Sequence, residues 1–420
     1  MADRKMLLLL TNRYPFSPGE EYLHTEIPFL AQEFDEVAIV PLMRMPGSTH
    51  SRELPSNVTV IDVAVEHGWR TRIGTIVRGP LRRPVSSDAS TVAARAYERY
   101  FTARTQRLAQ EVGPAVQRHI EASSADVTVI YAYWFYITTS VAIELKQGIP
   151  ALEGVPIVAR GHGYDVNEAA SPVRYLPQRR HLLASVEALH PTADTITERL
   201  QHDWPMYASK LSTRRLGVVP ADPAPRTNSG PLNVLSCSSL SPIKRLDLMV
   251  AAVAECRRRG RDVTWTHIGS GTRQQEARLA RAAKRAGLGN AFVRTGQLDN
   301  AEVYRVLASG KHTLFLNTSS SESVSFSMSE AMSAGLPVVG TDVVGTHEIL
   351  TDRVNGRLVS RDPSPAELAD AIEWVAERGA DDYQEMCAAS RRTADRLLDP
   401  RAEYRRFASD LRKRGRANGS

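Results

Sequence analysis

The sequence has few cysteines and no long apolar run. Its 420 residues include three cysteines, which are far apart and form no CxxC pair: Cys237, Cys256 and Cys387. We therefore expect neither a disulfide framework nor a zinc site, and a reducing cytoplasm is the expected compartment. The apolar run at residues 6–10 is shorter than the core of a secretory signal or a membrane span. It predicts a buried first strand.

Several nucleotide- and metal-binding signatures are also missing. No helix-turn-helix, RNA-binding or zinc-finger pattern occurs, so we expect no nucleic-acid partner. No full Gly-x-Gly-x-x-Gly follows the first predicted strand, which argues against a nicotinamide-linked dehydrogenase. No DxD-type metal motif occurs in the segments expected to line a site. We therefore expect neither a metal ion nor another cofactor.

Positive charge is concentrated in one segment. The whole chain carries a formal charge of +6, and residues 68–120 contain ten arginines against three acidic residues. The arginines are Arg70, Arg72, Arg78, Arg82, Arg83, Arg95, Arg99, Arg104, Arg107 and Arg118. Two readings stay open: a solvated helical face, or a patch for anionic inner-membrane lipid or a diphosphate-linked acceptor.

Short apolar, β-branched runs alternate with helical patterns along most of the chain. Strands are predicted at 5–11, 36–42, 58–64, 127–134, 157–160, 189–192, 233–238, 264–269, 292–295, 313–317, 338–341 and 356–359. Helical patterns separate most of them, for example at 20–33, 244–259, 273–285 and 366–378. Such alternation predicts an α/β protein with parallel sheets covered on both faces.

The pattern is interrupted at residues 218–233, where four prolines and several polar residues predict a domain linker. Each half is long enough for its own doubly wound sheet, which agrees with the length of the chain. Open α/β sheets bind ligands at the carboxyl ends of their strands. We therefore expect the site in a cleft between two domains.

The most informative stretch reads "SSSESVSFSMSEAMSAGLPVVG" and spans residues 319–340. It follows a predicted buried strand, and helical spacing resumes near Phe326. Unpaired N–H groups at a helix start favour an anion such as phosphate. Glu322 lies in the loop and Glu330 on the helix. They are either a solvated side chain and a helix cap, or acceptors for the hydroxyls of a sugar and a ribose flanking a diphosphate.

This stretch resembles the signature of retaining glycosyltransferases with the GT-B fold, specifically glycosyltransferase family 4 (glycosyl transferases group 1). The two glutamates have the separation found in that signature, and they are followed by "EAM" at 330–332, "GLPV" at 335–338 and "GTHE" at 345–348. The segment "VNGRLV" at 354–359 matches the next element of the family pattern. The resemblance implies two Rossmann-like domains facing a cleft. It implies an acceptor-side domain at 1–218, a nucleotide-sugar domain at 219–395, and a C-terminal helix and basic tail at 396–420 packing toward the first domain.

The resemblance also implies roles for residues of the second half. Glu322 would contact the transferred sugar, Glu330 the ribose, and Lys244 the diphosphate. Further donor contacts are expected from Gly269, Gly271, Ser323, Ser325, Phe326 and Ser327. The family's arginine five residues before the lysine is Ser239 here. We hypothesise that Arg245 supplies the missing charge. Ser323 and Ser325 replace typical glycines.

In the first half, "TNRYPFSPGEEYLHTEIPFL" at 11–30 resembles a bacterial branch of the family involved in surface polysaccharides. Gly19 is the best donor-contact candidate there. Glu20 is a weaker candidate, expected on the acceptor side, and Tyr22 and Glu26 are also weaker candidates. "IVARGHGYDVNE" at 157–168 places three polar candidates past a strand end: Arg160, His162 and Asp165. Arg160 and Asp165 are expected on the acceptor side. His162 is expected beside the transferred sugar. Tyr133 and Trp134 are either core residues or stack on an acceptor sugar.

The resemblance predicts a retaining glycosyltransferase that moves a sugar from a nucleoside-diphosphate sugar to a glycan or lipid-linked acceptor. The expected setting is bacterial surface-polysaccharide or glycolipid assembly, in the cytoplasm or at the inner face of the membrane. Two alternatives stay open: a nucleotide-sugar 2-epimerase on the same architecture, and a non-catalytic sugar-binding relative. Epimer formation without an acceptor would indicate the first, and failure to bind any nucleoside diphosphate would favour the second.

Overall fold

The computed structural model describes residues 4–16, 19–44, 48, 52–63 and 88–417. The chain divides into two compact units: Met1–Gly217 with Pro400–Ser420 (unit 1), and Val218–Asp399 (unit 2). The sequence placed the boundaries after residues 218 and 395, so the second one lies four residues later than predicted. The chain passes between the units twice, and its last helix belongs to unit 1.

Unit 1 contains a six-stranded parallel sheet in the order β3-β2-β1-β4-β5-β6. The strands are β1 (Lys5–Thr11), β2 (Glu36–Pro41), β3 (Val58–Val60), β4 (Asp126–Ala132), β5 (Ile157–Gly161) and β6 (Ala188–Pro191). The helices are α1 (Leu23–Glu33), α3 (Val92–Ala122), α4 (Ile137–Gly148), α5 (Arg179–Ser185), α6 (Asp194–Asp203) and α14 (Pro400–Ala417). The order is that of a doubly wound Rossmann sheet.

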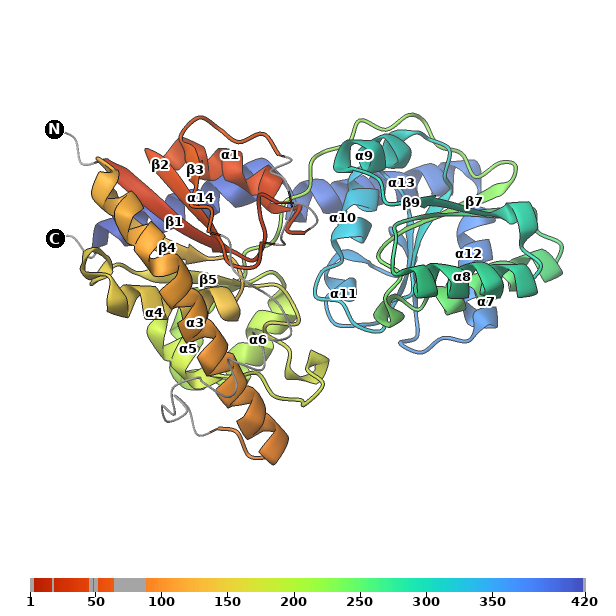
Figure 1. Ribbon diagram of the computed structural model, residues 1–420. Helices are drawn as coiled ribbons and strands as arrows, with labels where there is room; N and C mark the ends of the chain where they lie inside the picture. The colour runs from red at the N-terminus through yellow and green to blue at the C-terminus, as the bar shows by residue number, and fades with distance from the viewer. Residues whose placement is uncertain (1–3, 17–18, 45–47, 49–51, 64–87, 418–420) are drawn as a thin grey trace. The chain divides into compact units, whose positions relative to one another are not determined.

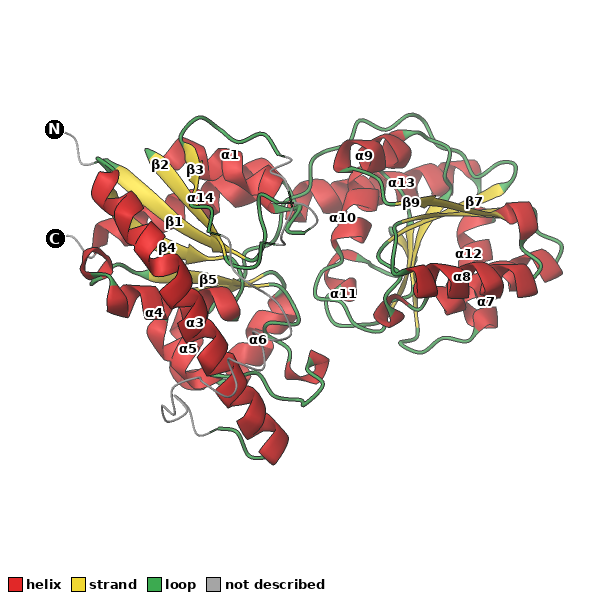
Figure 2. Cartoon of the chain, in the orientation of Figure 1, coloured by secondary structure: helices red, strands yellow, loops and turns green. Residues whose placement is uncertain are grey.

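Both faces of this sheet are covered, which explains why β1 reads as an unbroken apolar run rather than an alternating one. Leu7 and Leu9 pack with Ile27 of α1 and with Phe407 and Leu411 of α14 in one buried cluster. Helix α4 contacts β1, β4 and β5 and packs against α3. Figure 2 shows the strands of this sheet between their helices.

Unit 2 contains a second six-stranded parallel sheet, in the order β12-β11-β10-β7-β8-β9. The strands are β7 (Leu232–Cys237), β8 (Val263–Ile268), β9 (Phe292–Gly296), β10 (Leu314–Asn317), β11 (Val338–Thr341) and β12 (Gly356–Val359). The helices are α7 (Leu246–Arg258), α8 (Arg273–Arg285), α9 (Asn300–Ala308), α10 (Phe326–Ser333), α11 (Thr346–Ile349), α12 (Pro365–Ala376) and α13 (Ala380–Leu397). Separate buried clusters form on its two faces.

The strand orders locate the expected binding edges. In each sheet the order reverses between two neighbouring strands, β1 and β4 in unit 1 and β7 and β10 in unit 2. Loops diverge at such a switch point and leave a crevice at the carboxyl ends of the strands. The loops that follow these four strands are the ones that carry most of the predicted site residues. The prediction of two doubly wound α/β domains is therefore confirmed.

The predicted linker has no regular structure over residues 218–229, but it lies against unit 2. Arg226 is 6% exposed. Its guanidinium donates to the carbonyls of His312 and Ala334, at 3.1 Å in each case, and to that of Leu307. The composition of this segment predicts a solvent-exposed linker, but hydrogen bonds hold the segment against unit 2.

Candidate functional site

The centre of the candidate site is an ion pair between two predicted donor-site residues of unit 2. Lys244 Nζ lies 2.6 Å from Glu322 Oε1, and the side chains are 22% and 11% exposed. Lys244 ends a single turn after β7, and Glu322 lies in the loop after β10. Since β7 and β10 are neighbours in the sheet, two residues 78 positions apart meet at the switch point.

The start of α10 forms the second part of the site. Ser325 is the N-cap of this helix, but its side chain makes no capping hydrogen bond. Instead, Ser325 Oγ accepts a bond from Asn317 Nδ2 at 3.1 Å and lies 3.3 Å from Ser327 Oγ. The N–H groups of the first turn remain uncapped by that side chain, which suits an anion. Phe326 partly packs on the buried cluster beneath the helix, so its ring supports the fold.

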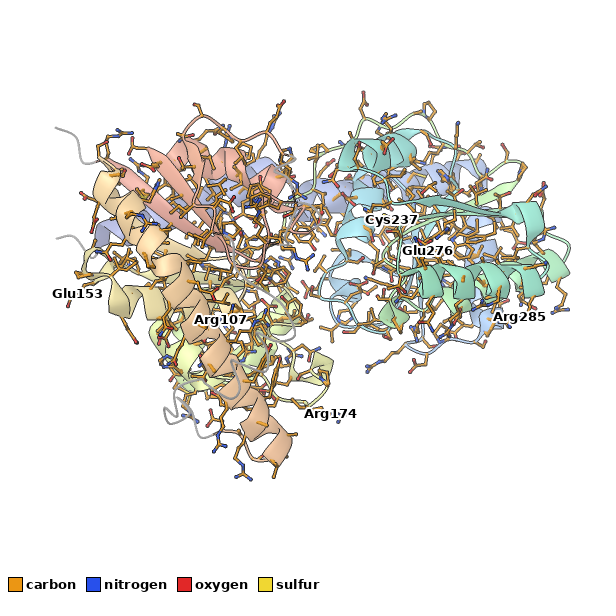
Figure 3. The ribbon with its side chains drawn as sticks, in the orientation of Figure 1. Arg107, Glu153, Arg174, Cys237, Glu276 and Arg285 are labelled. Carbon is orange, nitrogen blue, oxygen red and sulfur yellow. The ribbon has the colours of Figure 1, made fainter. Side chains whose placement is uncertain are left out.

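Glu330 is buried on α10, with 7% of its surface exposed. Burial raises the pKa of Glu330 to about 7, and a hydrogen bond from the Tyr304 hydroxyl opposes that rise. Cys237, labelled in Figure 3, lies close enough that the Glu330 charge adds to the burial that raises the pKa of its thiol to about 12. Tyr304 was not predicted, because α9 carries no local signal for a partner 26 residues away.

Arg245 occupies a different environment from the one hypothesised. Its backbone is left-handed, with φ of 50°. Its guanidinium donates to the carbonyls of Thr318, Ser319 and Arg361, and to the carboxylate of Asp362. The side chain therefore joins three loops of unit 2, and its hydrogen bonds go to protein oxygens.

The two glycines after β8 allow close approach of neighbouring loops. A Cβ on Gly269 would lie 1.9 Å from the carbonyl oxygen of Ser238, and one on Gly271 would lie 2.9 Å from Leu240 Cβ. A third glycine, Gly345, presses on the Glu322 loop, because a Cβ there would lie 0.9 Å from the carbonyl oxygen of Ser323. Glycine at these positions shapes the edge of the sheet.

In unit 1, His162 follows β5 and is partly exposed. Its Nε2 lies 2.8 Å from the Tyr133 carbonyl oxygen, so this nitrogen carries the proton. Burial, with a further contribution from the charge of Arg160, lowers the pKa of His162 to about 3. The imidazole is therefore neutral near pH 7. The side chain can therefore form hydrogen bonds, but it supplies no positive charge.

Aromatic rings surround His162. The ring of Trp134 lies 4.4 Å from that of His162 and 5.0 Å from that of Tyr164. Tyr133 is fully buried, so it is a core residue, whereas Trp134 is partly exposed. Tyr164 is 48% exposed and was not singled out in the sequence, although it lies between His162 and Asp165. Trp134, Tyr164 and the partly exposed Tyr22, whose ring centroid lies 6.3 Å from that of His162, are thus aromatic side chains here that a ligand can reach.

Glu20 was predicted as an acceptor contact, but its carboxylate is used inside the fold. It is 5% exposed and accepts hydrogen bonds from the backbone N–H groups of Asn12, Arg13 and Tyr14 at 2.6–2.8 Å. Trp134 Nε1 donates to the same carboxylate at 2.6 Å. Gly19 precedes it with φ of +130°, which allows the chain to turn inward at this point.

Arg160 and Asp165 also have internal roles, which corrects their placement on the acceptor side. Both are fully buried. Arg160 Nη2 lies 3.1 Å from Glu26 Oε1, and its guanidinium stacks on the ring of Phe407 at 4.3 Å. Asp165 accepts backbone N–H bonds from residues 135, 162 and 163 at 2.8–3.0 Å. Asp165 therefore braces the loop that carries His162, and Arg160 holds α14 to the sheet.

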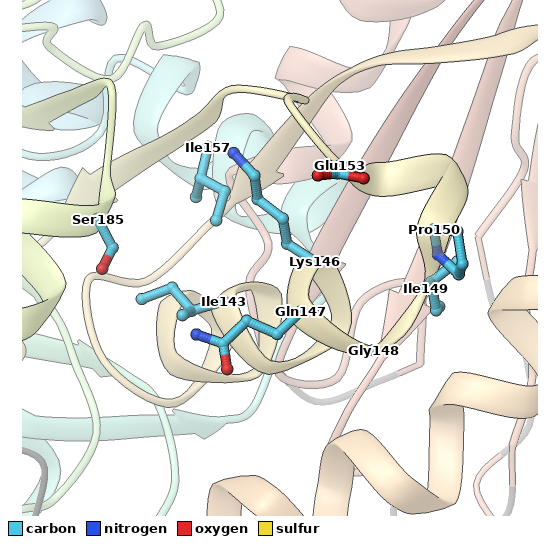
Figure 4. A pocket seen from close by; sticks show the side chains of 9 residues that line it. All are labelled: Ile143, Lys146, Gln147, Gly148, Ile149, Pro150, Glu153, Ile157 and Ser185. Atoms are coloured by element: carbon cyan, nitrogen blue, oxygen red, sulfur yellow. The ribbon is translucent and has the colours of Figure 1, made fainter.

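A pocket of ≈ 530 Å³ lies elsewhere in unit 1 (Figure 4). It is lined by Lys146, Glu153 and Ser185, with Ile157 at the first position of β5. It therefore opens at the amino end of β5, whereas the predicted site residues follow the carboxyl ends of the strands. Nothing in the sequence pointed to this pocket.

Other predictions concern metal ions, membranes and the arginine-rich segment. The described part of the chain contains no group of three metal-ligating side chains and no helix long and apolar enough to cross a bilayer. The expectation of no cofactor stays a prediction. Five of the ten arginines lie outside the described residues, namely Arg70, Arg72, Arg78, Arg82 and Arg83. On α3, Arg95, Arg99 and Arg118 are exposed, Arg104 contacts Met43, and Arg107 (labelled in Figure 3) pairs with Glu111.

Comparison with known proteins gives a family match within unit 2. Residues 231–378 match the family described as "Glycosyl transferases group 1". A Streptococcus gordonii protein named UDP-N-acetylglucosamine--peptide N-acetylglucosaminyltransferase GtfA subunit is 26% identical over 214 residues, which are 49% of this chain and 40% of that protein. The match thus spans less than half the length of that relative.

Two longer matches extend across both units. The amylovoran biosynthesis glycosyltransferase AmsK of Erwinia amylovora is 24% identical over 300 residues, covering 69% of this chain and 70% of that protein. The structure of Anabaena Alr3699/HepE in complex with UDP and glucose superposes with a TM-score of 0.66 at 17% identity, covering 96% of this chain and 98% of that one. With the two parallel sheets, this likeness shows that the fold is GT-B.

Proposed function

We propose that this chain, whose residues 231–378 match the glycosyl transferases group 1 family, is a glycosyltransferase that takes a sugar from a UDP-sugar and passes it to an acceptor hydroxyl. The streptococcal relative carries UDP-N-acetylglucosamine in its name, and the Anabaena structure holds UDP with glucose. The name of the Erwinia relative supports a role in surface-polysaccharide assembly. We further propose membership of family 4 and retention at the anomeric carbon, on the resemblance of the 322–348 motif.

The observation that carries the proposal is the meeting of Lys244 and Glu322 beside the uncapped start of α10. One cation and a row of N–H groups suit the diphosphate, and the carboxylate suits sugar hydroxyls. Glu330, with Tyr304 as its partner, is assigned to the ribose hydroxyls. Negative charge develops on the departing diphosphate during transfer. Lys244 and the helix start therefore stabilise the transition state more strongly than the bound donor.

The proposed reaction breaks the bond between the anomeric carbon and the diphosphate oxygen. It forms a bond from the acceptor oxygen on the same face, and a diphosphate oxygen takes the acceptor's proton. The neutral His162 is assigned to a hydrogen bond with the transferred sugar, and Trp134 with Tyr164 to the acceptor. The donor is thus assigned to unit 2 and the acceptor to unit 1.

A screen of thermal stability against UDP, GDP, ADP and dTDP, followed by the corresponding sugars, tests the donor assignment. We expect UDP to raise the melting temperature most, because binding to the native state stabilises it by RT ln(1 + [L]/Kd). No response to any of the four nucleotides would refute the proposal. The comparisons do not favour a 2-epimerase. Rapid epimerisation of the donor without an acceptor would reverse that conclusion.

We also propose that residues 68–120 contact anionic lipid when the acceptor is membrane-bound. The support is the excess of arginine in this segment and the exposure of Arg95, Arg99 and Arg118 on α3. Replacement of Arg78, Arg82 and Arg83 by serine should weaken binding to vesicles that contain acidic lipid, because each basic residue near such a surface contributes about 1 kcal/mol. Equal binding of the variant and the unmodified protein would refute this part.

A further inference from the structure

Arg245 makes the densest set of hydrogen bonds among the side chains of the candidate donor site. Its Nε donates to the Thr318 carbonyl at 2.5 Å, and its Nη2 donates to the carbonyls of Ser319 at 3.1 Å and Arg361 at 2.8 Å. Its Nη1 lies 2.8 Å from Asp362 Oδ1. A planar guanidinium has five N–H groups in a fixed fork. Four of them are therefore engaged by protein oxygens.

Hydrogen bonds also run in the opposite direction, from the loop after β10 to the turn that carries Arg245. Thr318 Oγ1 donates back to the carbonyls of Lys244 at 2.9 Å and Arg245 at 3.2 Å. The Ser320 N–H donates to the Ile243 carbonyl at 2.8 Å. The turn that carries Lys244 and the start of the loop that carries Glu322 are thus joined in both directions. The Lys244–Glu322 contact of 2.6 Å lies next to this joint.

The backbone of Arg245 adds a second observation. Its φ of 50° is a left-handed conformation that glycine adopts more readily than arginine. Arginine is nevertheless present, with its side chain only 19% exposed. The left-handed turn directs successive side chains to different partners: Lys244 to Glu322, and Arg245 to the carbonyls of the neighbouring loops.

We infer that Arg245 is a positioning residue that sets the geometry of Lys244 and Glu322, and that it is not a ligand of the donor diphosphate. The inference rests on the proposed function. It replaces the hypothesis that Arg245 substitutes for the arginine absent at Ser239. On this assignment the charge of Arg245 matters less than its fork of N–H groups, because the acceptors it joins are mostly carbonyls.

The test is the Arg245→Gly variant, with Arg353→Gly as its matched control. Arg353 is also left-handed, with φ of 63°, but its side chain is 70% exposed and lies 3.7 Å from its one acidic neighbour, Asp352. Misplacement of catalytic groups by an ångström can cost on the order of 100-fold in rate. We expect kcat to fall by about this factor in Arg245→Gly, with the UDP dissociation constant within about threefold and Arg353→Gly unchanged.

Three readouts separate positioning from phosphate binding. Arg245→Lys keeps the charge but not the fork, so it should remain as impaired as Arg245→Gly. Methylguanidinium should restore part of the lost kcat in Arg245→Gly, and methylammonium at equal ionic strength should not. Recovery in Arg245→Lys, or a tenfold loss of UDP affinity in Arg245→Gly, would overturn the inference and favour a diphosphate ligand.

A further variant covers the case in which Arg245→Gly does not fold. Thr318→Val removes the hydroxyl that donates back to the turn, and it should also lower kcat more than it changes UDP affinity. Unchanged kcat in Thr318→Val, or in a folded Arg245→Gly, would overturn the inference. If the unmodified protein neither binds UDP nor transfers a sugar, the proposed function itself fails, and this outcome is distinct from the others.

Discussion

Neutralising Glu322 should affect the free nucleotide and the intact donor in opposite directions. Glu322 holds Lys244 in an ion pair of 2.6 Å, so both groups are occupied before a donor arrives. UDP has a diphosphate that needs the lysine but no transferred sugar that needs the carboxylate. Glu322→Gln therefore frees the cation and removes a negative charge beside the incoming phosphates.

The magnitude follows from the environment of the pair. The side chains of Lys244 and Glu322 are 22% and 11% exposed, so the pair is partly shielded from water. Exposed ion pairs contribute about 0.2–1 kcal/mol, and pairs in a lower dielectric interact more strongly. We take ~1.4 kcal/mol, which corresponds to tenfold tighter UDP binding. For the donor, a lost hydrogen bond from a sugar hydroxyl to a carboxylate costs about 1.5–3 kcal/mol. The gain at the diphosphate offsets ~1.4 kcal/mol of this cost, so kcat/KM should fall by up to roughly 15-fold.

Titration calorimetry with UDP and a transfer assay with the donor measure the two effects. Glu255→Gln is the matched control, since it neutralises a glutamate of unit 2 that pairs instead with Arg258 and Arg259 at the C-terminal end of α7. The gain in UDP affinity should shrink as salt is raised from 0.05 to about 0.5 M, because screening weakens charge interactions. Unchanged or weaker UDP binding by Glu322→Gln would refute the assignment of Lys244 to the diphosphate.

Three further predictions concern the fold around the site. Gly345→Ala should lower both the melting temperature and UDP affinity, because its Cβ would lie 0.9 Å from the carbonyl oxygen of Ser323; a variant with both values unchanged would contradict the packing. Glu26→Gln should lower the free energy of unfolding by about 3–5 kcal/mol in urea titrations, since Arg160 would keep a buried charge without its partner; a loss below ~1 kcal/mol would contradict this. The folded-state pKa of Glu330, about 7, lies above its ordinary value of 4.5, so stability is lost as pH rises between them. Glu330→Gln should therefore gain stability over the unmodified protein by ~3 kcal/mol at pH 8 and much less at pH 5; an equal gain would contradict the shift.

The strands could be predicted from the sequence because their signal is local. Apolar, β-branched runs such as residues 5–11 and 338–341 coincide with β1 and β11. Their order in the two sheets was not predicted, since it depends on pairing between distant segments. The family pattern assigned Lys244 and Glu322 to one donor molecule, but the ion pair between them was not predicted, because it joins residues 78 positions apart.

Residues whose partners are distant in sequence were predicted least well. Glu20 looked like a free carboxylate after a turn, but it folds back onto N–H groups six to eight positions before it. Arg160 looked like a cleft residue because it precedes His162, yet its partners include Glu26, 134 positions away. At a strand end, neighbouring side chains point to opposite sides of the sheet. A local motif therefore does not show which of them enters the core.

The double passage of the chain makes unit 2 an insertion within unit 1. Gly217 and Pro400 are in direct contact, since a Cβ on Gly217 would lie 2.4 Å from Pro400 Cα. Deletion of residues 218–399 with direct fusion of the flanking residues is therefore a geometrically simple route to a free-standing unit 1. Chimaeras that exchange donor specificity with a relative need two junctions, at 217/218 and 399/400. With a single junction, Phe407 and Leu411 would come from a different protein than the sheet on which they pack.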